Sequence, residues 1–193
     1  MKKLFHFMVI ISFIFILGCS ASDSESIAKN KSETASDADS TKVVWMAFNA
    51  GIEKGVKENK NIIVDFYTDW CHWCKVMDEK TFSDPKVAKE LKEKFITIRI
   101  NAESKTEKAS FQGNEYTNVE LTHAFHVTGF PSLAFISPQQ EVITVIPGYI
   151  PAEQFYYLLS YVDQECYKKQ LSLDEFIKRK GDCDSTKGQS GKI

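Results

Sequence analysis

The chain has 193 residues, of which 24 are Lys or Arg and 26 are Asp or Glu, so its formal net charge at pH 7 is -2. This near-neutral balance gives no reason to expect nucleic acid as a partner. Hydrophobic residues make up 43% of the chain, which is enough for the core of one ordinary domain with appendages.

The first 18 residues have the layout of a bacterial export signal. Two lysines precede an apolar run over residues 4–17, which is short for a membrane span. The run ends at Gly18 and Cys19, and this ending resembles the cleavage box of bacterial lipoproteins. The resemblance implies cleavage before Cys19, lipidation of its thiol, and a protein anchored to a bacterial membrane that faces the periplasm or the cell exterior. An ordinary signal peptide or an uncleaved anchor is the alternative.

Residues 19–42 follow the signal and are nearly devoid of apolar side chains. Such a segment cannot bury enough surface to offset the entropy of ordering it, so we expect a disordered tether. A folded domain is predicted over residues 43–164, and residues 165–193 form a C-terminal extension.

Helices and strands are predicted to alternate through the domain. Apolar residues at helical spacing indicate an amphipathic helix within residues 43–60, weakened by two glycines. Residues 102–117 are polar and aperiodic, so a long loop is expected there. The other predicted elements are a strand at 62–67, a helix after Cys71, a helix opened by Pro85, a strand at 95–101, a short helix at 118–125, strands at 132–136 and 141–146, and a helix opened by Pro151.

This element order predicts an α/β fold. A helical crossover makes the first two strands parallel, and the later hairpin adds antiparallel strands. The result is a mixed central sheet flanked by helices.

Cys71 and Cys74 stand at i and i+3, just after the first strand and at the start of a helix. Unpaired backbone N–H groups and the helix dipole favour a thiolate at that position, and the spacing permits a short disulfide. Zinc and haem sites use the same spacing. However, Lys75 stands where haem attachment requires His, and no second ligand pair follows. The context therefore favours redox chemistry, with no cofactor and no resident metal ion.

The cysteine motif and its surroundings resemble the thioredoxin superfamily. The likeness covers about residues 43–162 and is carried by residues 64–75 together with Gly-Phe-Pro-Ser at 129–132. Residues 81–85 look most like exported thioredoxin-like domains, including the C-terminal domain of the transmembrane thiol:disulfide interchange reductase. The resemblance implies a thioredoxin fold with Cys-x-x-Cys at a helix N-terminus. The chain departs from thioredoxin in the dipeptide between the cysteines, in the longer loop and in the tail.

Cys71 is the expected nucleophile, and Cys74, expected to be more buried, would resolve the mixed disulfide. The alternative, a static structural disulfide, would close too small a loop to constrain the unfolded chain much. Asp65 lies in an apolar strand, where its pKa should rise. The resemblance implies that Asp65 takes the proton of the resolving cysteine; a structurally satisfied aspartate is the alternative. Arg99 falls where thioredoxin has a lysine, and it is either a partner of Asp65 or a solvated strand residue.

Pro131 is implied by the resemblance to form a cis bond facing the disulfide. The backbone at Phe130 would then be exposed to an extended substrate, whereas the alternative is a trans proline that opens a strand. Trp70 and Trp73 should flank the reactive sulfur as substrate-binding residues, although Trp70 also has a core explanation. His72 either stabilises the thiolate and makes the disulfide more oxidising, or points into solvent.

Once Cys19 is assigned to lipid, four cysteines remain, an even number for an oxidising compartment. Cys166 and Cys183 bracket a short segment with a capping-box pattern at Ser172 and Glu175. We expect them to form a structural disulfide, and the alternative is a second redox pair that relays electrons.

These features predict a membrane-tethered thiol–disulfide oxidoreductase that reduces disulfides of exported proteins, with a membrane redox partner that regenerates its dithiol. One alternative is a disulfide oxidase or isomerase that uses the same site. Another is a non-enzymatic carrier in which Cys71, His72 and Cys74 bind a soft metal ion. The direction of electron flow depends on the dipeptide between the cysteines and does not follow from the sequence.

Overall fold

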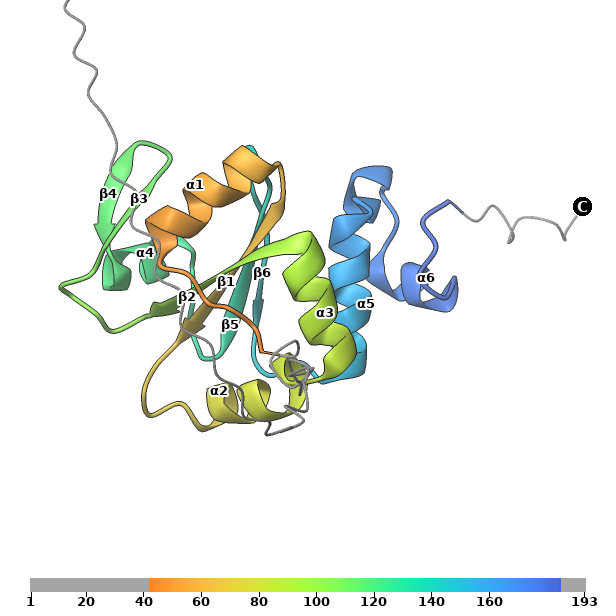
Figure 1. Ribbon diagram of the computed structural model, residues 1–193, viewed down its shortest axis with the longest axis horizontal. Helices are drawn as coiled ribbons and strands as arrows, with labels where there is room; N and C mark the ends of the chain where they lie inside the picture. The colour runs from red at the N-terminus through yellow and green to blue at the C-terminus, as the bar shows by residue number, and fades with distance from the viewer. Residues whose placement is uncertain (1–41, 185–193) are drawn as a thin grey trace, which may run out of the picture. The chain divides into compact units, whose positions relative to one another are not determined.

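The computed structural model describes residues 42–184 (Figure 1). The predicted signal peptide, Cys19 and nearly all of the predicted tether lie outside the described residues. Within residues 42–184, no helix has the length and apolar character needed to cross a membrane. The helices are α1 (Phe48–Glu58), α2 (His72–Met77), α3 (Pro85–Lys94), α4 (Asn118–Ala124), α5 (Ala152–Asp163) and α6 (Leu173–Lys178). The strands are β1 (Asn61–Tyr67), β2 (Phe95–Asn101), β3 (Lys108–Phe111), β4 (Asn114–Thr117), β5 (Ser132–Ile136) and β6 (Val142–Pro147).

The central sheet has the strand order β2-β1-β5-β6. Strand β1 pairs in parallel with β2 and antiparallel with β5, and β5 pairs antiparallel with β6. This confirms the predicted mixed sheet. The register places Asp65 directly opposite Arg99 on the neighbouring parallel strand, so two charged residues face each other inside an otherwise apolar layer.

Helices cover both faces of this sheet (Figure 1). Because side chains alternate along a strand, Ile62, Val64 and Phe66 of β1 pack on the face that carries α1 and α4. Ile63 packs on the opposite face with residues of α2, α3 and α5. Asp65 has the same parity as Ile63 and is therefore directed towards the α2 face, beneath the cysteine helix.

The two glycines of α1 allow this helix to lie close against the sheet. A Cβ atom at Gly51 would come within 2.2 Å of Ile98 Cγ1, and one at Gly55 would come within 2.4 Å of Ile62 Cγ1. From helix propensity alone these glycines are weak points of α1. Their absent side chains also provide the space in which β1 and β2 pack against the helix.

The first helix begins later than predicted, because residues 43–46 run along the outer edge of β2. We call these residues the N-terminal strap. Met46 N–H donates to Thr97 O at 2.9 Å, and Arg99 N–H donates to Met46 O at 3.1 Å. The Thr97 hydroxyl also donates to Val44 O at 2.6 Å. The strap thereby covers the exposed hydrogen-bonding groups of an edge strand.

The predicted loop at residues 102–117 is also partly wrong, since it contains the antiparallel hairpin β3–β4. Ala109 and Phe111 of β3 are buried in the same cluster as α1 and α4. Thr117 then caps α4 through a capping box with Glu120. The inserted segment is therefore a small folded element that extends one face of the core.

The C-terminal extension packs beside α5 and contains α6 (Figure 1). Cys166 and Cys183 are joined by a disulfide, with their Cα atoms 5.6 Å apart. Phe176 of α6 is fully buried with them, and the Tyr161 hydroxyl donates to Leu171 O at 2.6 Å. Tyr161 and Leu173 pack against both this cluster and the core on the α2 face of the sheet.

Candidate active site

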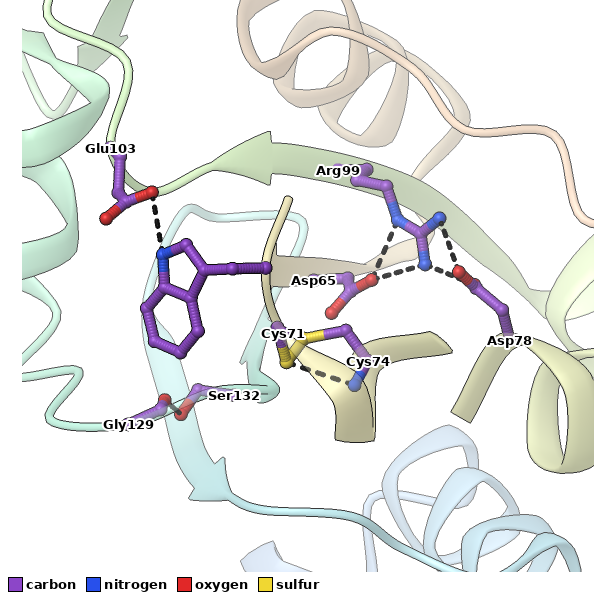
Figure 2. The surroundings of a disulfide bond; sticks show 9 residues. Asp65, Cys71, Cys74, Asp78, Arg99, Glu103, Gly129 and Ser132 are labelled. Carbon is purple, nitrogen blue, oxygen red and sulfur yellow. Dashed lines mark hydrogen bonds and ion pairs between the residues drawn. A yellow bond between two sulfur atoms is a disulfide. The ribbon is translucent and has the colours of Figure 1, made fainter. Parts of the chain in front are cut away.

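Cys71 is the N-cap residue of α2 and is joined to Cys74 by a disulfide, with an S–S distance of 2.07 Å and a Cα–Cα distance of 5.3 Å. The Cys71 sulfur accepts a hydrogen bond from the Cys74 backbone N–H at 3.0 Å (Figure 2). A thiolate at this atom would receive the same bond and would face the positive end of the helix dipole. Both cysteines are buried, at 3% and 5% exposure, so Cys74 is not the more buried of the two in this oxidised form.

Asp65 lies next to this disulfide (Figure 2) and is 1% exposed. Its Oδ2 atom accepts from Arg99 Nε at 2.8 Å and lies 2.6 Å from Arg99 Nη2. Its Oδ1 atom is buried and has no hydrogen-bond partner among the described residues. Figure 2 shows one oxygen of Asp65 bonded to Arg99 and the other on the side of Cys71 and Cys74. This buried carboxyl group therefore keeps one oxygen without a hydrogen bond from the described part of the chain.

Burial raises the pKa of Asp65 from 3.8 to about 6. The charge and hydrogen bonds of Arg99 act against this rise, and the nearby carboxylate of Asp78 adds to it. Because the loss of hydration outweighs the ion pair, the carboxyl group can gain or lose a proton near neutral pH. A residue with this behaviour is suited to general acid–base chemistry.

Arg99 connects Asp65 to a second carboxylate that sequence reasoning missed. The guanidinium contacts Asp78 through Nη2–Oδ1 at 2.5 Å and Nη1–Oδ2 at 3.3 Å. The alternative of a solvated strand arginine is wrong, since the side chain is only 21% exposed. Asp78 stands seven residues after Cys71, at the junction of α2 and the π-helical turn Asp78–Phe82. Asp78 lies on a helix, and no pattern in the sequence indicates that a residue at this position contacts Arg99 of β2.

Three aromatic side chains pack close to the Arg99 guanidinium. The guanidinium carbon lies 4.3 Å from the ring centroid of Trp45, 5.3 Å from that of Tyr67 and 5.8 Å from that of Phe82. Such cation–π contacts are compatible with a partly dehydrated charge. Trp45 was predicted to lie in the first helix, and its place on the N-terminal strap brings it here instead.

Two exposed tryptophans flank the cysteine pair. Trp70 is 67% exposed and Trp73 is 54% exposed, so a core role for Trp70 is wrong. The Trp70 indole N–H donates to Glu103 at 3.0 Å, and its ring lies 6.1 Å from that of Phe130. The Trp73 ring lies 5.5 Å from that of Tyr149, a residue that carries no motif in the sequence. Phe130 and Tyr149 thus contact the two tryptophans that flank the cysteines in the sequence.

The Phe130–Pro131 peptide bond is cis, and Pro131 is buried at the start of β5. The turn is fixed by the Ser132 hydroxyl, which donates to Gly129 O at 2.7 Å, and by Gly148 N–H, which donates to Pro131 O at 2.7 Å. Through Phe130 and its contact with Trp70, the turn borders the cysteine motif. Because the bond is cis, the alternative of a trans proline that opens a strand is wrong.

His72 is exposed at the first position of α2, with its ring 5.7 Å from that of Trp73. Its predicted effect on the thiolate stays a prediction. Among residues 42–184, no group of three or more His, Cys, Asp and Glu side chains is placed to hold a metal ion.

Comparison with known proteins identifies the family. Residues 48–163 match the family model described as a thioredoxin-like domain. The thiol:disulfide interchange protein DsbD of Yersinia pestis (strain Pestoides F) is 31% identical over 100 residues, which cover 51% of this chain and 15% of that protein. DsbD of Vibrio vulnificus (strain CMCP6) is 32% identical over 98 residues, covering 50% of this chain and 15% of that protein. The chain thus matches a small part of these curated relatives.

Two solved structures show the same fold. A thioredoxin from Thermus thermophilus superposes with a TM-score of 0.51 at 21% identity, covering 62% of this chain and 86% of that one. A thioredoxin-fold protein from Helicobacter pylori gives a TM-score of 0.52 at 19% identity, covering 74% of this chain and 85% of that one. Since the family match extends over more than half of the sequence and includes the cysteine pair, the buried aspartate and the cis proline, the chain belongs to the thioredoxin-like domain family.

Proposed function

We propose that this chain catalyses thiol–disulfide exchange through Cys71 and Cys74. The observation that carries the proposal is the free Oδ1 atom of Asp65, buried beneath a cysteine pair at a helix N-terminus. A purely structural disulfide has no need of an unpaired buried acceptor with a raised pKa. A thiol that must lose its proton while it is buried does need one.

In the reducing direction, the Cys71 thiolate attacks one sulfur of a substrate disulfide. The substrate S–S bond breaks, a mixed disulfide forms with Cys71, and the other substrate sulfur leaves and takes a proton from solvent. The Cys74 thiol then gives its proton to Asp65 Oδ1 and attacks the Cys71 sulfur. The mixed disulfide breaks, the substrate sulfur leaves as a thiolate and takes a proton from solvent, and the substrate departs as a dithiol, while Asp65 returns its proton to solvent. Two electrons have passed to the substrate, and the Cys71–Cys74 disulfide is restored.

The substrate segment is proposed to bind in extended form beside the cis-proline turn. The backbone preceding Pro131 can pair with such a segment, as an added strand pairs with an exposed edge. Phe130, Trp70 and Trp73 supply the apolar contacts around the reactive sulfur. Main-chain pairing combined with apolar contact suits unfolded or loop segments that contain a disulfide.

We further propose that the protein acts as a reductant of exported proteins while tethered to a bacterial membrane by lipid on Cys19. The layout of residues 1–19 supports the tether, and the name of the DsbD relatives supports disulfide interchange. A membrane redox partner carrying a dithiol would supply the electrons that regenerate Cys71 and Cys74. An oxidase or isomerase using the same site is the second candidate, favoured only if exposed His72 stabilises the thiolate.

Reduction of insulin by dithiothreitol tests the exchange reaction. The wild-type chain should accelerate it, Cys71→Ser should abolish the acceleration, and Cys74→Ser should accumulate the mixed disulfide. The paired replacement Cys166→Ser with Cys183→Ser is the matched control and should retain activity. No acceleration by the wild type, with stoichiometric zinc or copper in the purified protein, would overturn the proposal in favour of the metal carrier.

Equilibration with glutathione redox buffers tests the direction. A potential at or below about −230 mV for the Cys71–Cys74 pair would support a reductant, whereas a value near about −120 mV would support an oxidant.

A further inference from the structure

We propose that Trp45, on the N-terminal strap, is a positioning residue for the exchange reaction. Its indole covers Arg99 and so keeps water away from the ion pair that holds Asp65. The inference rests on the proposed function, because it assumes that Asp65 accepts the proton of Cys74. It concerns a residue that precedes the family match, which begins at residue 48.

The strap fixes Trp45 in this place through hydrogen bonds to the backbone groups of both neighbouring residues. Val44 O accepts from the Thr97 hydroxyl at 2.6 Å, and Met46 exchanges two backbone bonds with β2. The Trp45 ring then lies 5.0 Å from that of Phe82 and 4.3 Å from the guanidinium carbon of Arg99. The indole is therefore held against the cation by contacts that do not involve Asp65.

A groove next to these residues gives water a route to the ion pair. Its volume is about 380 Å³, and it is lined by Lys42, Val43, Trp45, Asp78, Phe82, Ser83 and Arg99. Asp65 does not line it and is 1% exposed, whereas the Arg99 side chain is 21% exposed. Water that enters the groove therefore meets Arg99 first, and the indole forms part of the wall that limits this contact.

Several charged or titratable groups surround the Asp65 carboxyl group. Arg99 and Asp78 contact each other and act on it from β2 and from the end of α2, and Tyr67 on β1 is coupled to both Asp65 and Arg99. The cysteine pair lies above, and Lys42 lines the groove. Burial is the strongest of the influences on Asp65, so hydration is the quantity to which this carboxyl group should respond most.

Replacing the indole should therefore make Asp65 easier to ionise. Without the indole the groove would be larger, and more water would solvate the guanidinium and, through it, the carboxylate. The pKa of Asp65 would move from about 6 towards its ordinary value of 3.8. A weaker base accepts the Cys74 proton less readily, so resolution of the mixed disulfide would slow down as well.

The test compares Trp45→Ala with Trp45→Phe and with a matched control, Met46→Ala. Met46 lies on the same strap but packs against the opposite face of the sheet, away from Arg99. Resolution of a preformed mixed disulfide is followed in single turnovers from pH 4 to pH 8, and the Asp65 carboxyl carbon is titrated by NMR. Trp45→Ala should lower the midpoint of the Asp65 titration, and the inflection of the rate profile with it, by about one pH unit, which is a tenfold loss of proton affinity. Trp45→Phe should lower it less, and Met46→Ala should leave it in place.

Loss of stability without a change in the inflection, in either Trp45 variant, would show that the residue only anchors the strap and would overturn the inference. If Trp45→Ala fails to fold, the comparison of Trp45→Phe with Met46→Ala decides the matter by the same criterion. Asp65→Asn separates this failure from that of the proposed function. If Asp65→Asn leaves the wild-type pH profile unchanged, Asp65 is not the acceptor; if it removes the inflection, only the role of Trp45 is in question.

Discussion

Replacing Asp65 by Asn should change how the stability of the protein depends on pH. The folded carboxyl group has a pKa of about 6 against an ordinary value of 3.8, with burial as the main cause. An acid whose pKa is raised by folding stabilises the protein fully below the unfolded value and loses that contribution as pH rises through the folded value. The difference corresponds to roughly 3 kcal/mol, which is a large share of the stability of an ordinary domain.

The window of the effect is set by these two values. Below about pH 4 the carboxyl group is protonated in both the folded and the unfolded chain, so Asp65 carries no ionisation penalty there. Between about pH 4 and 6 the Asp65 carboxyl group is ionised in the unfolded chain but still largely protonated in the folded chain, so the wild type loses stability as pH rises. An amide at this position cannot ionise, so the stability of Asp65→Asn should not fall in this pH range for that reason. The free energy of unfolding of the variant, relative to wild type, should therefore rise by roughly 3 kcal/mol from pH 4 to pH 8.

Guanidinium unfolding of the oxidised proteins, followed by tryptophan fluorescence at several pH values, measures this difference. Glu79→Gln is a suitable control, because Glu79 is an exposed carboxylate on the π-helical turn that Asp78 begins. The difference in the free energy of unfolding between Glu79→Gln and wild type should stay nearly constant from about pH 4 to pH 8. A constant or falling difference for Asp65→Asn would refute the reasoning, since it would mean that the ion pair with Arg99 outweighs burial.

Three further changes probe other parts of the molecule. Gly51→Ala would place a Cβ atom 2.2 Å from a β2 isoleucine and should cost about 1–3 kcal/mol in thermal unfolding, whereas Gly129→Ala, with no atom within 4 Å, should cost little. Replacing Cys166 and Cys183 together by Ser should cost roughly 3 kcal/mol of stability, and mass spectrometry after mild reduction of wild type should find this disulfide intact when Cys71–Cys74 has opened. His72→Ala should reduce the ultraviolet thiolate absorbance of the reduced protein at a given pH near neutrality, and an unchanged absorbance would remove His72 from the mechanism.

The sequence singled out those candidate site residues whose chemistry is tied to a local pattern. Cys71 and Cys74 follow a buried strand and precede a helix, and that context alone indicates a helix N-terminus. Asp65 is conspicuous because an acidic residue interrupts an apolar strand. For Arg99 the resemblance to thioredoxin left two alternatives, and the register of β1 and β2 in the structure brings it opposite Asp65.

The residues that were missed depend on contacts between distant elements. Trp45 has helical spacing with Phe48, but the hydrogen bonds of an uncovered β2 edge draw residues 43–46 into extended conformation. Asp78 lies on a helical surface like many solvated carboxylates, and only the tertiary structure places it on Arg99. The β3–β4 hairpin has four-residue strands, which are too short for alternation to separate them from a polar loop.

The C-terminal cluster bears on how the protein should be produced. The family match stops at residue 163, but residues of the C-terminal extension complete the packing on the aromatic side of α5. The Tyr161 ring lies 5.5 Å from that of Phe176, and Gln164 donates to Gly181 O at 3.1 Å. A recombinant domain cut at residue 163 would leave Tyr161 without this cover. A usable expression boundary therefore lies beyond Cys183, in a host compartment where the loop from Cys166 can be oxidised during folding.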